Sequence, residues 1–204
     1  MVMNFAEIAF SESVKAQQEK FGSRRSYARM DSLPRGTMLG AAEAAFIQER
    51  DSFYLATIGE RGYPYVQFRG GPVGFLKTRD PGTLAFADFR GNRQYVSLGN
   101  TQRNDKAALI LMDYPNRKRL KIFARIETVD ASDAPELITQ LRDPAYDAVV
   151  ERAMILHVDA FDWNCPQHIL PRFTIDEINQ LNTPMYEHIV KIEAEIKRLK
   201  SHSV

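Results

Sequence analysis

Residues 53–69 read FYLATIGERGYPYVQFR, two runs of aromatic and β-branched residues on either side of a glycine-bearing turn. Such residues favour strands, and a short connection containing glycine between two of them is typical of a β-hairpin. Pro64 fits at a strand start or a sheet edge, because proline donates no backbone hydrogen bond. This stretch predicts an antiparallel sheet.

The hairpin pattern recurs along the chain. VGFLK (73–77) and TLAFAD (83–88) flank the turn TRDPG, and AALILMD (107–113) and RLKIFARIETVD (119–130) flank YPNRK. A last strand, RAMILHVDAFDW (152–163), follows a helical insertion near residues 133–150. Six or seven short strands separated by turns predict an antiparallel barrel or sandwich.

One strand shows which face is buried. In RLKIFARIE the apolar residues Leu120, Ile122, Ala124 and Ile126 alternate with the other side chains, so they share one face. The opposite face carries Arg119, Lys121 and Arg125 beside an aromatic ring. A solvated strand surface and part of a binding site are the two interpretations of this basic face.

Helices are predicted on both sides of the strands. Residues 5–20 form a possible helix, 22–36 an irregular basic connection, and the alanine-rich residues 37–50 a second helix. Thr183 and Pro184 resemble an N-cap and first helical position of a long C-terminal helix. Its apolar seam, at spacings of four and three, favours packing against the barrel over pairing between chains; the seam residues are Met185, Ile189, Ile192, Ile196 and Leu199.

The length of 204 residues suits one domain with helical additions. We expect a core at about 38–165, an N-terminal helical extension at 1–37 and a C-terminal helical extension at 166–204. The start of the chain lacks the features of a signal peptide, and no apolar run reaches the roughly 20 residues that span a bilayer. A cytoplasmic protein without membrane contact is expected.

The composition argues against two functional classes. With one cysteine, Cys165, and four histidines that form no i, i+4 pair, a metal centre is not expected. Residues 61–125 hold 13 Lys and Arg against 4 Asp, whereas the rest of the chain has a net charge of −8. These charges are dispersed among strand residues without basic runs, so they favour a small anionic ligand over nucleic acid.

Residues 86–95, FADFRGNRQY, are the candidate anion site. An apolar strand there gives way to a predicted helix start, where backbone N–H groups, Asn92, Arg93 and Gln94 would hold a phosphate. Gly91 would permit close approach. The alternative is an ordinary exposed turn, in which glycine and asparagine are common.

A second candidate is YVQFRGGPVGFLK, residues 65–77. Gln67 and Arg69 lie on one side of a strand because they are two residues apart, and Lys77 ends the next predicted strand. The glycine pair between them suggests a bend or bulge. A barrel corner with solvent-facing charges is the alternative.

Together these motifs, in this order, resemble the pyridoxamine 5'-phosphate oxidase-like flavoproteins. The resemblance covers about residues 40–165 and rests on the hairpin 53–77, the strand and turn TLAFADFRGNRQY, and the strand RLKIFARIE. It implies a mainly β, α+β fold: an antiparallel split β-barrel with flanking helices. It also implies FMN as the cofactor and a homodimer with flavin at the interface.

The resemblance further implies roles for individual residues. Arg69 and Lys77 correspond to basic residues that hold the phosphate and approach the ring, and Arg119 to a polar residue contributed across the dimer interface. The resemblance and the motifs together give these cofactor-binding candidates: Gln67, Arg69, Lys77, Ala87, Asp88, Asn92, Arg93, Gln94 and Arg119. Where the oxidase carries a lysine, this chain has Gln94.

Two hypotheses for function remain open. The first is an FMN-dependent oxidoreductase that transfers hydride from an unidentified small molecule, with His168 and Arg172 as candidate substrate contacts. These two residues do not match the spacing of the oxidase, so FMN binding is expected more strongly than vitamin B6 oxidation. The second is a non-catalytic protein that binds flavin, haem or deazaflavin on the same fold.

Overall fold

The computed structural model describes residues 4–32, 38–163 and 166–201. Its contacts divide the chain into two compact units, the first comprising residues 1–113 and 118–167 and the second residues 114–117 and 168–204. The prediction of a single domain over the whole chain stays a prediction. None of the described helices is both long enough and apolar enough to cross a membrane.

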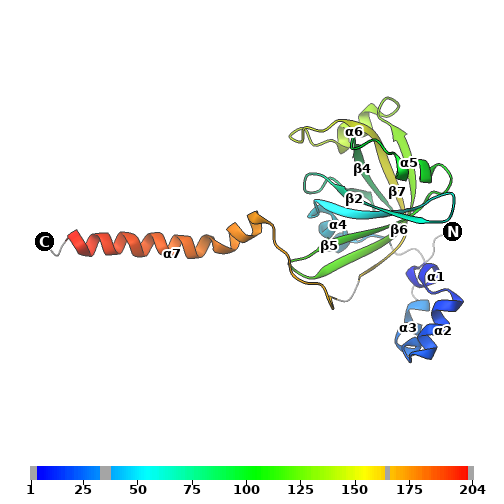
Figure 1. Ribbon diagram of the computed structural model, residues 1–204, viewed down its shortest axis with the longest axis horizontal. Helices are drawn as coiled ribbons and strands as arrows, with labels where there is room; N and C mark the ends of the chain where they lie inside the picture. The colour runs from blue at the N-terminus through cyan, green and yellow to red at the C-terminus, as the bar shows by residue number, and fades with distance from the viewer. Residues whose placement is uncertain (1–3, 33–37, 164–165, 202–204) are drawn as a thin grey trace. The chain divides into compact units, whose positions relative to one another are not determined.

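The first unit is built on one seven-stranded antiparallel sheet (Figure 1). The strands run in the order β2-β1-β5-β6-β7-β4-β3, so β2 and β3 are its two edges and the barrel is split. Their bounds are β1 Ser52–Ile58, β2 Pro64–Gly70, β3 Lys77–Asp80, β4 Thr83–Phe89, β5 Lys106–Asp113, β6 Lys118–Asp130 and β7 Val150–Trp163. The antiparallel split-barrel fold predicted from the sequence is confirmed.

Seven helices accompany the sheet in the described residues. They are α1 Phe5–Ala9, α2 Glu12–Lys20, α3 Arg24–Asp31, α4 Ala41–Gln48, α5 Val96–Thr101, α6 Pro135–Leu141 and α7 Ile175–Ser201. The helix predicted at 37–50 corresponds to α4.

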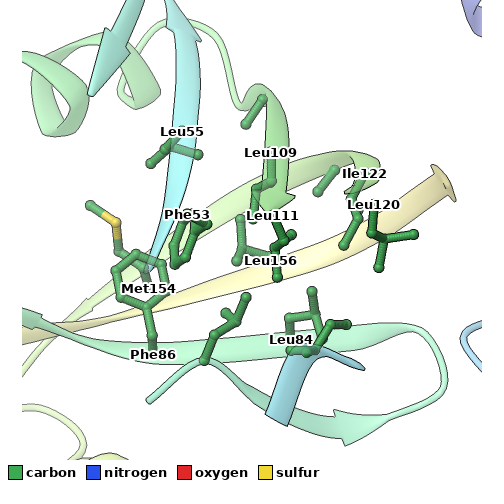
Figure 2. Close-up of a cluster of buried hydrophobic side chains, with 14 of the residues drawn as sticks. Phe53, Leu55, Leu84, Phe86, Leu109, Leu111, Leu120, Ile122, Met154 and Leu156 are labelled. Atoms are coloured by element: carbon green, nitrogen blue, oxygen red, sulfur yellow. The ribbon is translucent and has the colours of Figure 1, made fainter. Parts of the chain in front are cut away.

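The core lies on the concave side of the sheet, where strands from both halves of the sequence meet (Figure 2). Phe53 on β1 contacts the rings of Phe75 and Phe86, with ring centroids 5.6 and 5.3 Å apart. On β6, Leu120, Ile122, Ala124 and Ile126 are all buried, as their alternation predicted. The long strands β6 and β7 pair over most of their length and support this core.

One predicted strand is wrong. Residues 73–77 do not form a strand, and β3 begins only at Lys77. The preceding residues form a turn, closed by a hydrogen bond from Phe75 N to Pro72 O at 2.9 Å, in which Gly74 has a φ of 77°. The apolar run resembles a strand because Phe75 and Leu76 are buried in the core, although the backbone that carries them is a loop.

Three predictions about the helices near the N-terminus and in the insertion need correction. The single helix predicted at 5–20 is two helices, since Ser11 caps α2 by accepting a hydrogen bond from Val14 N. The predicted connection 22–36 contains α3, and its last residues lie outside the described part of the chain. In the insertion, α6 ends at Leu141 because Pro144 follows closely and disfavours helical backbone before it.

The C-terminal helix begins nine residues earlier than predicted. Thr174 accepts a hydrogen bond from Glu177 N at 3.2 Å, and Thr174 N donates to Glu177 Oε2 at 2.7 Å, which is a capping box. Pro184 lies inside the helix. The hydroxyl of Thr183 donates to Asn179 O at 2.9 Å, so Thr183 is a helical residue and no N-cap.

Candidate functional site

A cavity of about 230 Å³ opens where β2, β4, the start of β7 and the segment after β4 meet. On β2 the side chains alternate, so that Tyr65, Gln67 and Arg69 line the cavity while Val66 and Phe68 are exposed on the other face. The cavity is lined by Tyr65, Gln67, Arg69, Asp88, Phe89, Gly91, Asn92, Arg93, Gln94, Tyr95, Val96, Ser97, Leu98, Glu151 and Arg152. Three arginines and two carboxylates thus surround it.

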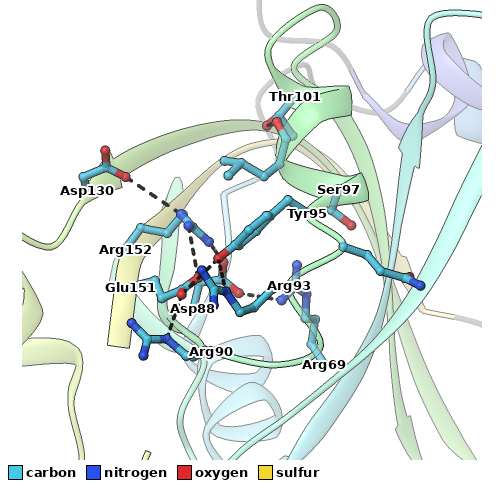
Figure 3. A network of polar contacts seen from close by, with 12 residues as sticks. Arg69, Asp88, Arg90, Arg93, Tyr95, Ser97, Thr101, Asp130, Glu151 and Arg152 are labelled. Atoms are coloured by element: carbon cyan, nitrogen blue, oxygen red, sulfur yellow. Dashed lines mark hydrogen bonds and ion pairs between the residues drawn. The ribbon is translucent and has the colours of Figure 1, made fainter. Parts of the chain in front are cut away.

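Asp88, the buried carboxylate at the end of β4, sits between two arginines (Figure 3). Its Oδ1 accepts a hydrogen bond from Arg69 Nη1 at 2.5 Å, and its Oδ2 accepts one from Arg152 Nη1 at 2.6 Å. Arg152 stands directly opposite Asp88 in the β4–β7 register. Charge-assisted hydrogen bonds of this kind are roughly twice as strong as neutral ones and fix both arginines.

Glu151 is the second carboxylate of the network. Its Oε1 accepts hydrogen bonds from Arg90 Nε at 2.9 Å and from the Tyr95 hydroxyl at 3.1 Å, while its Oε2 accepts one from Arg152 Nη2 at 3.2 Å. The hydrogen bond from Arg90 is the largest cause that lowers the pKa of Glu151 below its ordinary value of 4.5. Glu151 is therefore ionised at neutral pH and holds the two arginines and the tyrosine together.

Two arginines of the cavity are held firmly in the charged form. Burial lowers the pKa of Arg152, but the hydrogen bonds and charges of Asp88 and Glu151 outweigh it, so the net shift is upward. The hydrogen bond from Arg93 Nε to the Tyr95 hydroxyl, at 3.3 Å, raises the pKa of Arg93. Both remain cations throughout the range in which a phosphate is an anion.

The segment between β4 and α5 has an unusual backbone. Arg93 and Tyr95 adopt φ values of 62° and 54°, a left-handed conformation that is uncommon outside glycine and often marks a functional site. The amide of Gln94 donates to Asn92 Oδ1 at 3.2 Å. The predicted helix start at 92–94 is wrong, because α5 begins only at Val96 and is six residues long.

The cavity brings together six of the predicted site residues: Gln67, Arg69, Asp88, Asn92, Arg93 and Gln94. Ala87 is buried beside this group and lines a neighbouring cavity of about 200 Å³, which shares Gln67, Arg69 and Asp88 with the first. Lys77 on β3 and Arg119 on β6 line neither cavity.

The two predicted substrate residues belong to the second unit. His168 is exposed and has a φ of 64°. The guanidinium of Arg172 lies 5.0 Å from the ring centre of Tyr114, in the geometry of a cation–π contact.

Sequence reasoning missed Tyr95, Glu151 and Arg152. The available signal was Asp88 itself, because a carboxylate in an apolar strand needs a cationic partner when it is buried. Its partner lies 64 residues away, and only the β4–β7 pairing identifies it. Tyr95 was part of the quoted motif, but its role depends on Glu151.

Replacing the buried carboxylate is expected to destabilise the fold. Asp88→Asn keeps the shape of the side chain but removes the buried negative charge that contacts both Arg69 and Arg152, which should lower the free energy of unfolding by about 3–5 kcal/mol. Urea denaturation in phosphate-free buffer measures this. The control is Asp159→Asn, in an exposed pair with Arg125, with an expected loss under about 1 kcal/mol. Equal losses in the two variants would contradict the assigned role of Asp88.

The contribution of Glu151 to stability should depend on pH. Because folding lowers its pKa, the ionised side chain stabilises the protein above pH 4.5, and this stabilisation disappears as the pH falls through the lowered value. The melting temperature of the wild type should therefore exceed that of Glu151→Gln at pH 6–7, and the two should converge in acid. Glu60→Gln, at an exposed pair with Arg103, is the control. A difference that is constant between pH 3 and pH 7 would disprove this linkage.

Comparison with known proteins identifies the family. A family model described as pyridoxamine 5'-phosphate oxidase matches residues 39–179. No curated protein matches the sequence significantly.

Solved structures provide more distant similarities. A putative pyridoxamine 5'-phosphate oxidase from Lactobacillus delbrueckii is 19% identical, with 62% of this chain and 95% of that chain covered and a TM-score of 0.48. An FMN-binding protein from Syntrophomonas wolfei is 13% identical, with 76% and 96% covered and a TM-score of 0.45. HupZ from Group A Streptococcus is 14% identical, with 67% and 100% covered and a TM-score of 0.48. At these values the similarities carry no argument about function.

The family model spans more than half of the 204 residues, and its range contains the split barrel and every residue that lines the arginine-rich cavity. The chain belongs to the pyridoxamine 5'-phosphate oxidase family.

Proposed function

We propose that this protein binds FMN in the arginine-lined cavity and uses it to oxidise or reduce a small molecule. The observation that carries the proposal is the cluster of Arg69, Arg93 and Arg152 around one cavity in a chain of this family. A phosphate monoester is the ligand group that such a cluster suits best, because guanidinium groups donate paired hydrogen bonds to phosphate oxygens.

The hydrogen-bond donors of the cavity fit a phosphate. Arg69 Nε and Arg152 Nε are buried and have no hydrogen-bond partner among the described residues, although Arg152 Nε lies 3.9 Å from Asp130 Oδ1, at the distance of an ion pair. A buried donor without an acceptor is costly, by about 1–3 kcal/mol. A phosphate in the cavity would offer acceptors to the guanidinium groups of Arg69 and Arg152, and the exposed side chains of Asn92, Arg93 and Gln94 line the same cavity.

The space around Gly91 fits the same ligand. A side chain at this position would meet no protein atom within 4 Å, and the backbone there does not adopt a positive φ. Neither packing nor conformation therefore requires glycine at 91. In our proposal, the missing side chain leaves room for a ligand against the backbone.

The cavity and its neighbour, about 230 and 200 Å³, together fall within the size range of small-molecule sites, roughly 300–1,000 Å³. Gln67 lines both and is oriented by Ser97, whose hydroxyl donates to Gln67 Oε1 at 2.9 Å. This leaves the Gln67 amide nitrogen as a donor for a ring oxygen. When bound, FMN supplies hydride-transfer chemistry, and the side chains of this chain contribute binding and orientation.

A homodimer is part of the proposal. The outer face of the sheet carries the exposed apolar side chains of Tyr54, Val66 and Phe68, which continue into an apolar groove of about 200 Å³ over β1, β5 and β6. Contiguous apolar surface of this kind marks protein interfaces. Arg119, which lines neither cavity of its own chain, retains its proposed role as a residue contributed across that interface.

The first experiment compares FMN binding by the wild type and Arg93→Ala. Loss of one charge-assisted contact, about 1.5–3 kcal/mol, should raise the dissociation constant roughly 10- to 100-fold, measured by quenching of flavin fluorescence. Arg103→Ala removes another exposed arginine, one that lies outside the cavity, and should bind FMN like the wild type. Gly91→Ala should weaken binding without changing the melting temperature. If all three variants bind FMN equally, the cavity is not the phosphate site.

Repeated turnover distinguishes an enzyme from a protein that only binds the cofactor. The enzyme should bleach its flavin absorbance with a reductant and recover it with oxygen or another acceptor over many cycles. A non-catalytic protein that holds flavin, haem or deazaflavin is the alternative, favoured because both carboxylates that line the cavity, Asp88 and Glu151, are already engaged by arginines. Binding without repeated turnover of any reductant would support this alternative.

A further inference from the structure

The helix α7 exposes a long row of apolar side chains. It has 27 residues, Ile175–Ser201, and none of them is buried. Its exposed large apolar residues, between 42% and 77% accessible, are Ile175, Ile178, Leu181, Met185, Tyr186, Ile189, Val190, Ile192, Ile196 and Leu199. At about 1.5 Å per residue the helix is roughly 40 Å long.

These residues follow a seven-residue repeat that becomes evident only with the true start of the helix. Ile175, Asn182, Ile189 and Ile196 recur at intervals of seven, and Ile178, Met185, Ile192 and Leu199 recur three residues after each of them. In heptad notation these are the a and d positions of four consecutive heptads. Seven of the eight core positions are apolar, and four heptads are enough to indicate a coiled coil.

We infer that α7 pairs with α7 of a second copy of this chain in a parallel, two-stranded coiled coil. This inference does not rest on the proposed function, because none of the residues that line the arginine-rich cavity belongs to α7.

Asn182 favours this arrangement over the alternatives. It is the single polar residue among the core positions and is partly buried even on the isolated helix. In a parallel dimer, a positions face each other, so the two Asn182 side chains can hydrogen-bond across the interface. In an antiparallel pair, a positions face d positions, and Asn182 would meet an apolar side chain without a partner. A single asparagine at a also selects dimers against the larger assemblies that isoleucine at d promotes.

The residues that flank the core are complementary in a parallel pair. A residue at g lies near the residue five positions later on the other helix, at e. This places Glu195 beside Lys200 of the partner subunit and His188 beside Glu193 of the partner subunit. It also places Leu181 beside Tyr186 of the partner subunit, and none of these contacts joins like charges.

Pro184 is compatible with the pairing. It occupies a c position, on the outer face of the coil, so its ring does not meet the partner helix. The polar residues of the helix ends stabilise the helix itself, since Asp176 and Glu177 lie in the first turn and Arg198 and Lys200 in the last.

Disulfide trapping in the full-length chain tests the inference. In a Cys165→Ser background, which removes the only native cysteine, Leu199→Cys places a thiol at a d position. In a parallel pair the two thiols face each other, whereas in an antiparallel pair they lie near opposite ends. Oxidation at micromolar protein should give a covalent dimer roughly a hundredfold faster than for Lys191→Cys at an outer c position, because pairing holds the thiols at an effective concentration near the millimolar range.

Two further variants make the test specific. Ile189→Lys combined with Ile196→Lys should abolish the fast cross-linking at position 199 without affecting the fold of the barrel, checked by circular dichroism and FMN binding. Reversing the flanking pair, Glu195→Lys with Lys200→Glu, should retain the fast cross-linking at position 199. Glu195→Lys alone should slow this cross-linking, because it places two lysines beside each other. Equal rates at positions 199 and 191, or a trimer or tetramer by sedimentation, would overturn the inference.

Discussion

The site depends on the buried contact of Asp88 with Arg69 and Arg152. Each oxygen of the carboxylate accepts a hydrogen bond from one guanidinium, which connects an edge strand, β2, to the internal strands β4 and β7. Burying three charges is favourable only when their geometry satisfies most of their hydrogen bonds. Here both oxygens of the carboxylate accept a hydrogen bond while the Nε of each arginine makes none, so the network holds two cations in place without using all of their donors.

The rest of the first unit keeps this network in register. The buried alternating face of β6 and the aromatic contacts of Phe53 fix the packing of the sheet, and the sheet sets Asp88 opposite Arg152. Glu151 then extends the network to Tyr95 and to Arg90 on the segment after β4. A rigid sheet thus carries an irregular, partly exposed loop, an arrangement typical of ligand sites.

The second unit is organised by a different principle. Its helix α7 gains stability from its capping box and its charged ends, and within one chain it buries no side chain. In water an isolated helix is marginal, so an apolar row of this length is most stable when another helix covers it. In our interpretation, the arginine cluster is formed within the fold of one chain, whereas the apolar row of α7 is covered by a second chain.

Much of this molecule is predictable from local sequence. Hairpin turns, the alternation in β6 and the spacing of Gln67 and Arg69 are short-range patterns, and the structure reproduces them because strand geometry imposes a period of two on the side chains. The motif FADFRGNRQY correctly indicated the segment around which the cavity forms, and its order with the other strands identified the family. The errors arose where local signals competed. Thr183 and Pro184 have the residue types of a helix start but lie inside α7. The apolar run around Phe75 has the composition of a strand but forms a buried turn.

Only the tertiary structure decided which residues share the site. The partner of Asp88 is far away in sequence, and many long-range pairings are compatible with the same set of strands until the sheet order is known. The sequence analysis also predicted Lys77 and Arg119 as cofactor-binding residues, because the sheet order was not known. Within one chain, neither residue lines the cavity. The sequence by itself determined most of the strands, the hairpin turns and the basic character of the cavity, because these depend on neighbouring residues. The composition of the site depends on contacts between strands that are distant along the chain, so it required the fold.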